Sequence, residues 1–245
     1  MITEMKLGEL EMDFKTWRHV FKLDPAKIIT DEHLDRICKS GTDAILIGGS
    51  DHVTLNNVLS LAKRLQSYKL PMVLEVSTLD SVTLGFDYYF IPTVLNSDNP
   101  LWIKGLHHEA IRKYGEMMDW EELIPEGYCI LNANCKAAKL TDAQTDLTTE
   151  EVVAYARLAE HFFRLPIFYI EYSGMFGDMN VVEKVKKVLT ETRLFYGGGI
   201  DSVTAAKQVA AIADTVVVGN IIYENIEKAI ETVQAVAETA DESLY

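Results

Sequence analysis

The stretch "RLFYGGGIDSVTAAKQVAAIADTVVVGN", residues Arg193–Asn220, contains a strand, a helix and a second strand in succession. Its two ends are short apolar runs rich in β-branched and aromatic residues, which is typical of strands that are covered on both faces. Between them, apolar residues recur at helical spacing: Val203, Ala206, Ala210 and Ala213. A chain built from such units favours an α/β fold.

The same alternation continues along the chain. Eight segments are predicted as strands: those that begin at His19 ("HVFKLDP"), Asp43 ("DAILIGGS"), Pro71 ("PMVLEVS"), Tyr88 ("YYFIPTVLN"), Gly127 ("GYCILNA"), Ile167 ("IFYIEYS"), Arg193 ("RLFYGGG") and Thr215 ("TVVVGN"). Further helical faces are predicted from three apolar sets: Leu55, Val58, Leu61 and Leu65; Val152, Ala156, Ala159 and Phe163; and Ile226, Ile230, Val233 and Ala237.

Eight strands that alternate with helices, without a change in composition that would mark a linker, predict a single (β/α)₈ TIM barrel over residues 13–245. Residues 1–12 are expected to form an N-terminal extension. A doubly wound open sheet is the competing architecture, but the glycine pattern GxGxxG does not follow the first strand.

One connection departs from the pattern. The segment "TLDSVTLGFD", between the third and fourth predicted strands, is too short and too poor in helix-forming residues for an ordinary crossover helix. We therefore expect a short irregular or strand-like connection in place of the third helix.

Composition narrows the class of protein. The 245 residues are 48% hydrophobic and 24% charged, with 6 prolines, as in ordinary globular proteins. A formal net charge of −14 argues against nucleic acid as a partner, so an anionic substrate would need positive potential supplied locally. No apolar run is long enough to span a bilayer, and the acidic start "MITEMKLGELEMDF" is unlike a secretory signal, so we expect a cytoplasmic protein.

The cysteines and histidines form no metal-binding pattern. Cys38, Cys129 and Cys135 are odd in number and lack CxxC spacing, which is typical of buried, reduced thiols. His107 and His108 are adjacent and point in different directions on a helix, so they are poorly placed to share a metal ion.

In a barrel of this kind, the chemistry takes place at the carboxyl ends of the strands. Side chains alternate along a strand, so Lys22 and Asp24 point the same way, as do Tyr169, Glu171 and Ser173. We expect both polar sets to converge on the mouth of the barrel. The apolar residues expected to face the surrounding helices are Phe21, Leu23, Ile170 and Tyr172.

Glycines follow two neighbouring strands, as "GGGID" after the seventh and "GN" after the eighth. The loops at these positions often bind phosphate, because backbone N–H groups point at the anion and no Cβ blocks its approach. Alternatively, the glycines only permit a tight turn, with Asp201 or Ser202 as the helix cap.

The remaining candidates also have two interpretations. Lys22 and Asp24 are either functional or a structural ion pair near the rim. Asp24 and Ser50 offer the oxygen ligands that Mg²⁺ prefers, although two oxygens alone are a weak signal for a metal. Glu171 is the stronger candidate, since a carboxylate at the end of an apolar strand is either paired or functional.

Several motifs together resemble a known family. "HVFKLDP", "GTDAILIGGSDHVT", "YIEYSG", "LFYGGGI" and "VVVGNIIYENIEKA", spread from His19 to Ala229, are similar to the PcrB proteins, the bacterial branch of the geranylgeranylglyceryl phosphate synthase family. The resemblance implies a modified TIM barrel whose third helix is replaced. It also implies a homodimeric prenyltransferase that uses Mg²⁺ to join a polyprenyl diphosphate, heptaprenyl in this branch, to sn-glycerol 1-phosphate, with release of diphosphate.

Carried over to this sequence, the resemblance implies that Lys22 contacts glycerol phosphate and that Asp24 and Ser50 lie at the magnesium ion. The implied glycerol phosphate site also contains Tyr169, Glu171, Ser173, Gly174, Gly199, Gly219 and Asn220. In this scheme Glu171 accepts the proton of the attacking hydroxyl as a general base. Ser50 stands where related sequences carry threonine, and either residue supplies one hydroxyl oxygen.

A long prenyl chain also requires an apolar groove. The segments "DYYFIPTVLN" and "PLWIKGL" are candidates, although their residues are equally suited to barrel core and helix packing. A lipid product would bring a transient contact with a membrane, for which the sequence offers no basic amphipathic helix. Two rival functions remain: a phosphosugar isomerase or lyase on the same fold, and a non-catalytic interaction protein that binds phosphate.

Overall fold

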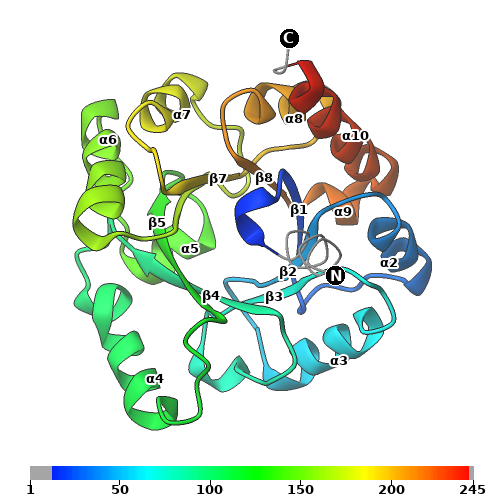
Figure 1. Cartoon of the computed structure of the whole chain (residues 1–245), viewed down its shortest axis with the longest axis horizontal. Helices are drawn as coiled ribbons and strands as arrows, with labels where there is room; N and C mark the ends of the chain where they lie inside the picture. The colour runs from blue at the N-terminus through cyan, green and yellow to red at the C-terminus, as the bar shows by residue number, and fades with distance from the viewer. Residues whose placement is uncertain (1–12, 243–245) are drawn as a thin grey trace, which may run out of the picture.

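In the computed structural model, which describes residues 13–242, parallel strands pair in sequence order and close into a barrel (Figure 1). The strands are β1 (His19–Leu23), β2 (Ala44–Ile47), β3 (Met72–Glu75), β4 (Tyr88–Val94), β5 (Leu123–Ile130), β6 (Ile167–Glu171), β7 (Arg193–Gly197) and β8 (Thr215–Val218). Pairing of β8 with β1 completes the ring. The predicted TIM barrel and each of its predicted strands are confirmed, whereas the predicted extension over residues 1–12 lies outside the described residues.

Helices surround the barrel (Figure 1). They are α2 (Asp31–Cys38), α3 (Leu55–Leu65), α4 (Leu106–Tyr114), α5 (Lys136–Thr141), α6 (Thr149–Arg157), α7 (Met179–Lys186), α8 (Val203–Ala210), α9 (Ile221–Glu224) and α10 (Ile226–Glu242). Polar side chains begin several of them. The Ser202 hydroxyl, for example, accepts a hydrogen bond from the Ala205 N–H at 3.3 Å and so caps α8, as one interpretation of the sequence expected.

A regular TIM barrel has its third helix between the third and fourth strands. Here the connection between β3 and β4 contains only a 3₁₀ turn, Leu79–Ser81, since α3 lies between β2 and β3. The prediction from the short segment is therefore confirmed. The Tyr89 hydroxyl donates a hydrogen bond to the Thr83 carbonyl at 2.9 Å and ties this loop to β4. As a result, Val82 and Leu84 lie beside the mouth of the barrel, where they line a cavity.

Two local predictions were incomplete. Strand β5 begins at Leu123 rather than Gly127, because the long strand β4 offers it pairing partners from Tyr89 to Val94. Phe163 was assigned to an apolar helical face, but its side chain is 43% exposed, and Leu55 and Val203, the first members of two other predicted faces, are 39% and 37% exposed. After α6 the chain widens into a π-helical turn, Leu158–Phe163, which changes the angular position of the residues that follow.

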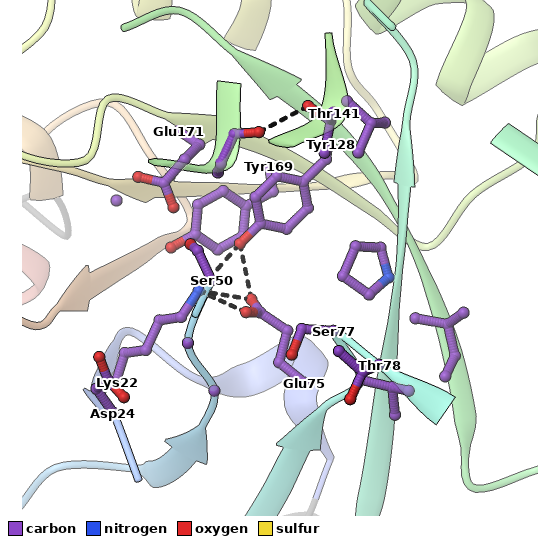
Figure 2. A pocket seen from close by; sticks show the side chains of 18 of the residues that line it. Lys22, Asp24, Ser50, Glu75, Ser77, Thr78, Tyr128, Thr141, Tyr169 and Glu171 are labelled. Carbon is purple, nitrogen blue, oxygen red and sulfur yellow. Dashed lines mark hydrogen bonds and ion pairs between the residues drawn. The ribbon is translucent and has the colours of Figure 1, made fainter. Parts of the chain in front are cut away.

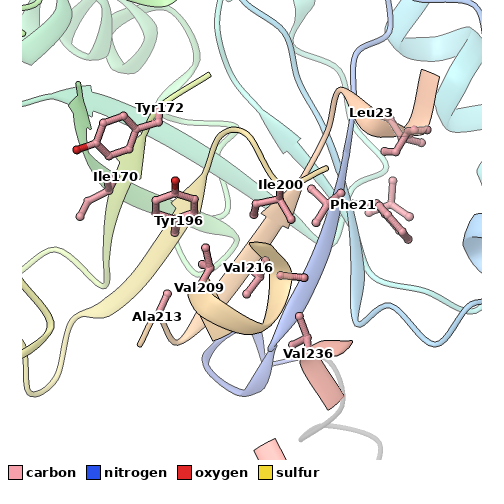
Figure 3. Packing of buried hydrophobic residues seen from close by; sticks show 14 of the residues in the cluster. Phe21, Leu23, Ile170, Tyr172, Tyr196, Ile200, Val209, Ala213, Val216 and Val236 are labelled. Atoms are coloured by element: carbon pink, nitrogen blue, oxygen red, sulfur yellow. The ribbon is translucent and has the colours of Figure 1, made fainter. Parts of the chain in front are cut away.

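Apolar side chains form two layers. One layer fills the barrel interior and includes Val20, Leu46, Val73, Phe90 and Phe195. The other lies between the strands and the helices, and it contains Phe21, Leu23, Ile170 and Tyr172 as expected (Figure 3). Full burial of such a side chain contributes about 2 kcal/mol to stability. The polar residues that alternate with the outer layer on β1 and β6 are thereby directed into the barrel.

Two further predictions concern reactive groups and membranes. Cys38, Cys129 and Cys135 are buried and unpaired, as predicted. Within residues 13–242, no helix has both the length and the apolar character needed to cross a membrane.

Candidate active site

A cavity of about 1710 Å³ opens at the carboxyl ends of the strands. It is lined by every site residue named from the sequence: Lys22, Asp24, Ser50, Tyr169, Glu171, Ser173, Gly174, Gly199, Gly219 and Asn220. Its volume exceeds the roughly 300–1,000 Å³ typical of small-molecule pockets. The strands thus bring residues from distant parts of the chain to one site with room for a long ligand.

Lys22 is the central cation of this site (Figure 2). Its ammonium group lies 2.6 and 2.8 Å from the two carboxylate oxygens of Glu75 and donates a hydrogen bond to the Tyr128 hydroxyl at 3.2 Å. Tyr128 in turn donates to Glu75 at 2.7 Å. The structural ion pair of Lys22 is therefore formed with Glu75 on β3, rather than with Asp24.

The Lys22 ammonium is surrounded by carboxyl groups. Burial disfavours its charge, but Glu75 and Glu171 outweigh that effect and raise the pKa of Lys22. Glu126 on β5 is completely buried, and within the described chain neither of its carboxylate oxygens has a hydrogen-bond partner. Burial, assisted by repulsion from Glu75, raises the pKa of Glu126 well above its ordinary value.

Glu171 ends β6 and is buried at the cavity wall. One of its carboxylate oxygens accepts a hydrogen bond from the Ser173 N–H at 2.6 Å, which fixes its orientation. Burial raises the pKa of Glu171, although the charge of Lys22 partly opposes this rise. The result is an oriented carboxylate with increased basicity, the properties required of a general base.

Two tyrosines form the wall beside Lys22. The rings of Tyr128 and Tyr169 stack with centroids 4.4 Å apart and an angle of 12° between their planes. The Lys22 nitrogen lies 5.8 and 5.7 Å from the two centroids, within range of a cation–π interaction. This contact holds the ammonium group in place without neutralising its charge.

The three successive glycines are explained by contacts between loops. A Cβ on Gly197 would overlap the Tyr169 hydroxyl. At Gly198, where φ is +129°, it would lie 2.6 Å from the backbone of Tyr172. Gly199 has φ of +63° and packs against the backbone of Phe176. The glycines therefore let the loop after β7 pack closely on the loop after β6, a role that requires no ligand; phosphate binding by this loop stays a prediction.

Asp24 and Ser50 line the cavity on the loops after β1 and β2 (Figure 2). A Cβ on Gly49 would lie 2.8 Å from an Asp24 carboxylate oxygen, so glycine permits Asp24 to approach this loop. One carboxylate and one hydroxyl fit Mg²⁺, which takes its other ligands from water and phosphates. In the described part of the chain, no three His, Cys, Asp or Glu side chains are grouped to hold a metal ion by themselves.

The other end of the cavity is apolar. Its wall includes Ile91, Pro92, Trp102, Ile103, Leu106, Ile111, Met117, Met118 and Trp120. The predicted groove segments thus supply part of this wall, through Ile91 and Trp102 among others, whereas Phe90 belongs to the barrel interior. Sequence reasoning missed the contribution that follows α4, notably Met117 and Trp120, whose side chains are exposed at the rim.

Glu75, Tyr128 and Glu126 were also missed. Glu75 carries the same signal that singled out Glu171, because it is a carboxylate in the apolar strand "PMVLEVS". That criterion, applied to every strand, would have found Glu75. Its pairing with Lys22, by contrast, depends on how strands that are not neighbours face each other across the barrel.

Comparisons with known proteins agree with this architecture. A family model described as the PcrB family matches residues 12–237. A heptaprenylglyceryl phosphate synthase of Lysinibacillus sphaericus is 59% identical over 228 residues, which is 93% of this chain and 100% of the relative. One from Geobacillus sp. is 60% identical over 224 residues, 91% of this chain and 98% of the relative.

Among solved structures, (S)-3-O-geranylgeranylglyceryl phosphate synthase from Thermoplasma acidophilum, in complex with its substrate sn-glycerol-1-phosphate, has a TM-score of 0.80. It is 24% identical in sequence, and the match covers 98% of both chains. At this level of identity, the likeness supports the fold.

Proposed function

The chain belongs to the PcrB family, and from this premise we propose that it is a prenyltransferase acting on sn-glycerol 1-phosphate. The donor is a long-chain polyprenyl diphosphate, heptaprenyl by analogy with the relatives named above, and the products are polyprenylglyceryl phosphate and diphosphate. The observation that carries this proposal is the form of the cavity, in which Lys22 and Glu171 lie in continuity with a long apolar wall. Such a cavity fits a substrate pair with a polar and a lipid end.

The proposed reaction exchanges one C–O bond for another. The bond between the allylic carbon of the donor and its diphosphate breaks, and the electron pair leaves with the diphosphate. A glycerol hydroxyl oxygen forms the new bond to that carbon, and its proton passes to the Glu171 carboxylate. The raised pKa of Glu171 favours this proton transfer.

Binding of the two anionic groups is divided between different residues in this proposal. Lys22, Tyr169, Ser173 and the glycine loops hold glycerol phosphate and orient its hydroxyl, which accelerates the reaction by proximity. Asp24 and Ser50 would hold Mg²⁺, which neutralises charge on the diphosphate when it is bound. The apolar wall accepts the prenyl chain and keeps water away from the allylic carbon.

The homodimer, the cytoplasmic location and a transient membrane contact for the lipid product belong to the same proposal. Each rests on the family resemblance or on composition. The cavity bears on them only through its apolar rim, where Met117 and Trp120 are exposed.

Product analysis tests the proposed activity. The purified protein is incubated with labelled sn-glycerol 1-phosphate, Mg²⁺ and a ladder of prenyl diphosphates of increasing length, and lipid products are extracted. We expect a prenylglyceryl phosphate, formed most efficiently with long donors. Absence of lipid product with every donor would contradict the proposal and favour the rivals, a phosphosugar isomerase or lyase or a non-catalytic phosphate-binding protein.

A further inference from the structure

Lys27 lies in the loop after β1, at the rim of the cavity. Its ammonium group donates a hydrogen bond to the side-chain oxygen of Asn220 at 3.0 Å and lies 4.7 Å from the centroid of the Tyr223 ring. Both partners are neutral, and both follow β8. Lys27 is therefore held in position by groups that leave its charge uncompensated.

The same tyrosine connects Lys27 to Asp24. The Asp24 backbone N–H donates a hydrogen bond to the Tyr223 hydroxyl at 2.9 Å, and the Lys27 N–H donates to the Asp24 carbonyl at 3.0 Å. These contacts fix the loop that carries both residues. Lys27 therefore lies in the same fixed loop as Asp24, whose carboxylate is proposed to hold the metal, and its ammonium group is anchored on the residues that follow β8.

Other lysines around the cavity differ from Lys27 in their partners or their position. Lys22 is paired with Glu75 at 2.6 Å, and Lys136 is paired with Asp51 at 3.0 Å. Lys104 follows β4, a strand that is a neighbour of neither β1 nor β8. Within the described residues, Lys27 forms no ion pair with a carboxylate, and it is the cavity lysine that lies in the same loop as Asp24.

We propose that Lys27 binds the diphosphate of the prenyl donor and stabilises the leaving group. This inference rests on the proposed function. When the C–O bond to the prenyl carbon breaks, its electron pair adds negative charge to the diphosphate, and Lys27 donates hydrogen bonds to that group without transferring a proton. In a chain of net charge −14, a fixed cation at this point supplies the local positive potential that an anionic substrate needs.

Asn220 makes a discriminating test necessary. Because this residue belongs to the predicted glycerol phosphate site and contacts Lys27, a lysine that only positioned Asn220 would affect glycerol phosphate instead. The two possibilities differ in which substrate loses affinity. Each substrate must therefore be measured separately.

The experiment compares Lys27→Met, which removes the charge, with Lys27→Arg, which keeps it, and with Lys63→Met, an exposed lysine on α3, as the matched control. Calorimetry measures binding of inorganic diphosphate in the presence of Mg²⁺, and steady-state kinetics give KM for each substrate. We expect Lys27→Met to weaken diphosphate binding at least about tenfold, the lower end of the range for a lost hydrogen bond to a charged group. KM of Lys27→Met for glycerol phosphate is expected to stay within about twofold of the wild-type value, a smaller change than the loss of such a hydrogen bond would cause.

Each remaining outcome has a defined meaning. We expect Lys27→Arg to retain most of the diphosphate affinity and Lys63→Met to match the wild type. Unchanged diphosphate affinity in Lys27→Met, or a selective loss of glycerol phosphate affinity, overturns the inference. A wild-type protein that binds diphosphate through Lys27 but makes no lipid would contradict the proposed function alone, so the two failures are distinguishable.

Discussion

Glu171 shows how one side chain acquires its chemistry from its surroundings. The Ser173 N–H orients its carboxylate, and burial raises its pKa. We expect Glu171→Gln to lose about 10²–10⁴-fold in turnover, the usual contribution of a general base, while it keeps its fold. Initial rates and circular dichroism check this, with Glu183→Gln on the exposed face of α7 as the control. Turnover within a few-fold of the wild type would exclude Glu171 as the base.

The same residue predicts the pH dependence of the reaction. A base must be ionised to accept a proton, so the rate is expected to fall on acidification as Glu171 becomes protonated. Because the pKa of Glu171 is raised, the fall should be centred above the ordinary value of about 4.5. Measurement of kcat/KM between pH 5 and pH 8 checks this prediction, and a rate that did not fall on acidification would contradict it.

Glu126 gives stability a pH dependence of opposite sign to that of a carboxylate in an ion pair, whose pKa is lowered. Its pKa is raised in the folded state, so the unfolded chain releases this proton first as pH increases from about 4.5. The contribution of Glu126 to wild-type stability should therefore decline with rising pH, by up to about 1.4 kcal/mol per unit, until the folded-state pKa is reached. In Glu126→Gln this contribution is absent.

Urea unfolding of the wild type and Glu126→Gln at pH 5 and pH 8 checks the prediction. We expect the variant to gain stability relative to the wild type between the two values. If the difference in free energy of unfolding were the same at both pH values, the carboxyl would have an unperturbed pKa and a partner not seen in the structure.

At the scale of elements, the π-helical turn after α6 is fastened by a single carboxylate. Glu160 accepts hydrogen bonds from the backbone N–H groups of Thr190, Glu191 and Thr192 at 3.2, 3.1 and 3.0 Å, and from the Thr190 hydroxyl. These bonds outweigh the effect of burial and lower the pKa of Glu160 to about 2. The turn is thereby attached to the chain that leads into β7.

We expect Glu160→Gln to cost roughly 3 kcal/mol of stability at pH 7, the free energy that corresponds to this pKa shift. Since the pKa is lowered, the contribution is complete above the ordinary value of about 4.5 and is lost as pH falls towards about 2. Urea unfolding measures the deficit of the variant, which should be clearly smaller at pH 3 than at pH 7, although part of it remains because pH 3 lies above the folded-state pKa. A deficit of the same size at both pH values would mean that shape, rather than charge, is responsible.

The elements also show what local sequence can and cannot predict. The strands were predictable because each is a short apolar run, and the altered connection after β3 because its length excludes a helix. The exposure of Phe163 was not, since a π-helical turn shifts the periodicity on which the prediction depended. Likewise, the contact of Lys22 with Glu75 is set by strand register and barrel closure, which no local pattern contains.

For the whole molecule, barrel closure brings the two halves of the chain together at His19 on β1. One ring nitrogen lies 2.9 Å from the Thr42 hydroxyl, and the other lies 3.0 Å from the Thr232 hydroxyl on α10. Burial lowers the pKa of His19 to about 3. The imidazole is consequently neutral in the folded protein and joins β1 to segments from both ends of the described chain.

This arrangement predicts how the entire fold responds to acid. Below the ordinary pKa of about 6.5, the unfolded chain binds a proton at His19 that the folded chain does not. The contribution of His19 to stability therefore falls as the pH is lowered from about 6.5 to about 3. His19→Gln keeps a polar side chain but cannot titrate, and we expect this variant to be less stable than the wild type at pH 7. Between pH 6.5 and pH 5, its free energy of unfolding should depend less steeply on pH than that of the wild type, by up to about 1.4 kcal/mol per pH unit. Urea unfolding across this range measures both slopes. Equal slopes would mean that His19 becomes protonated within the folded barrel.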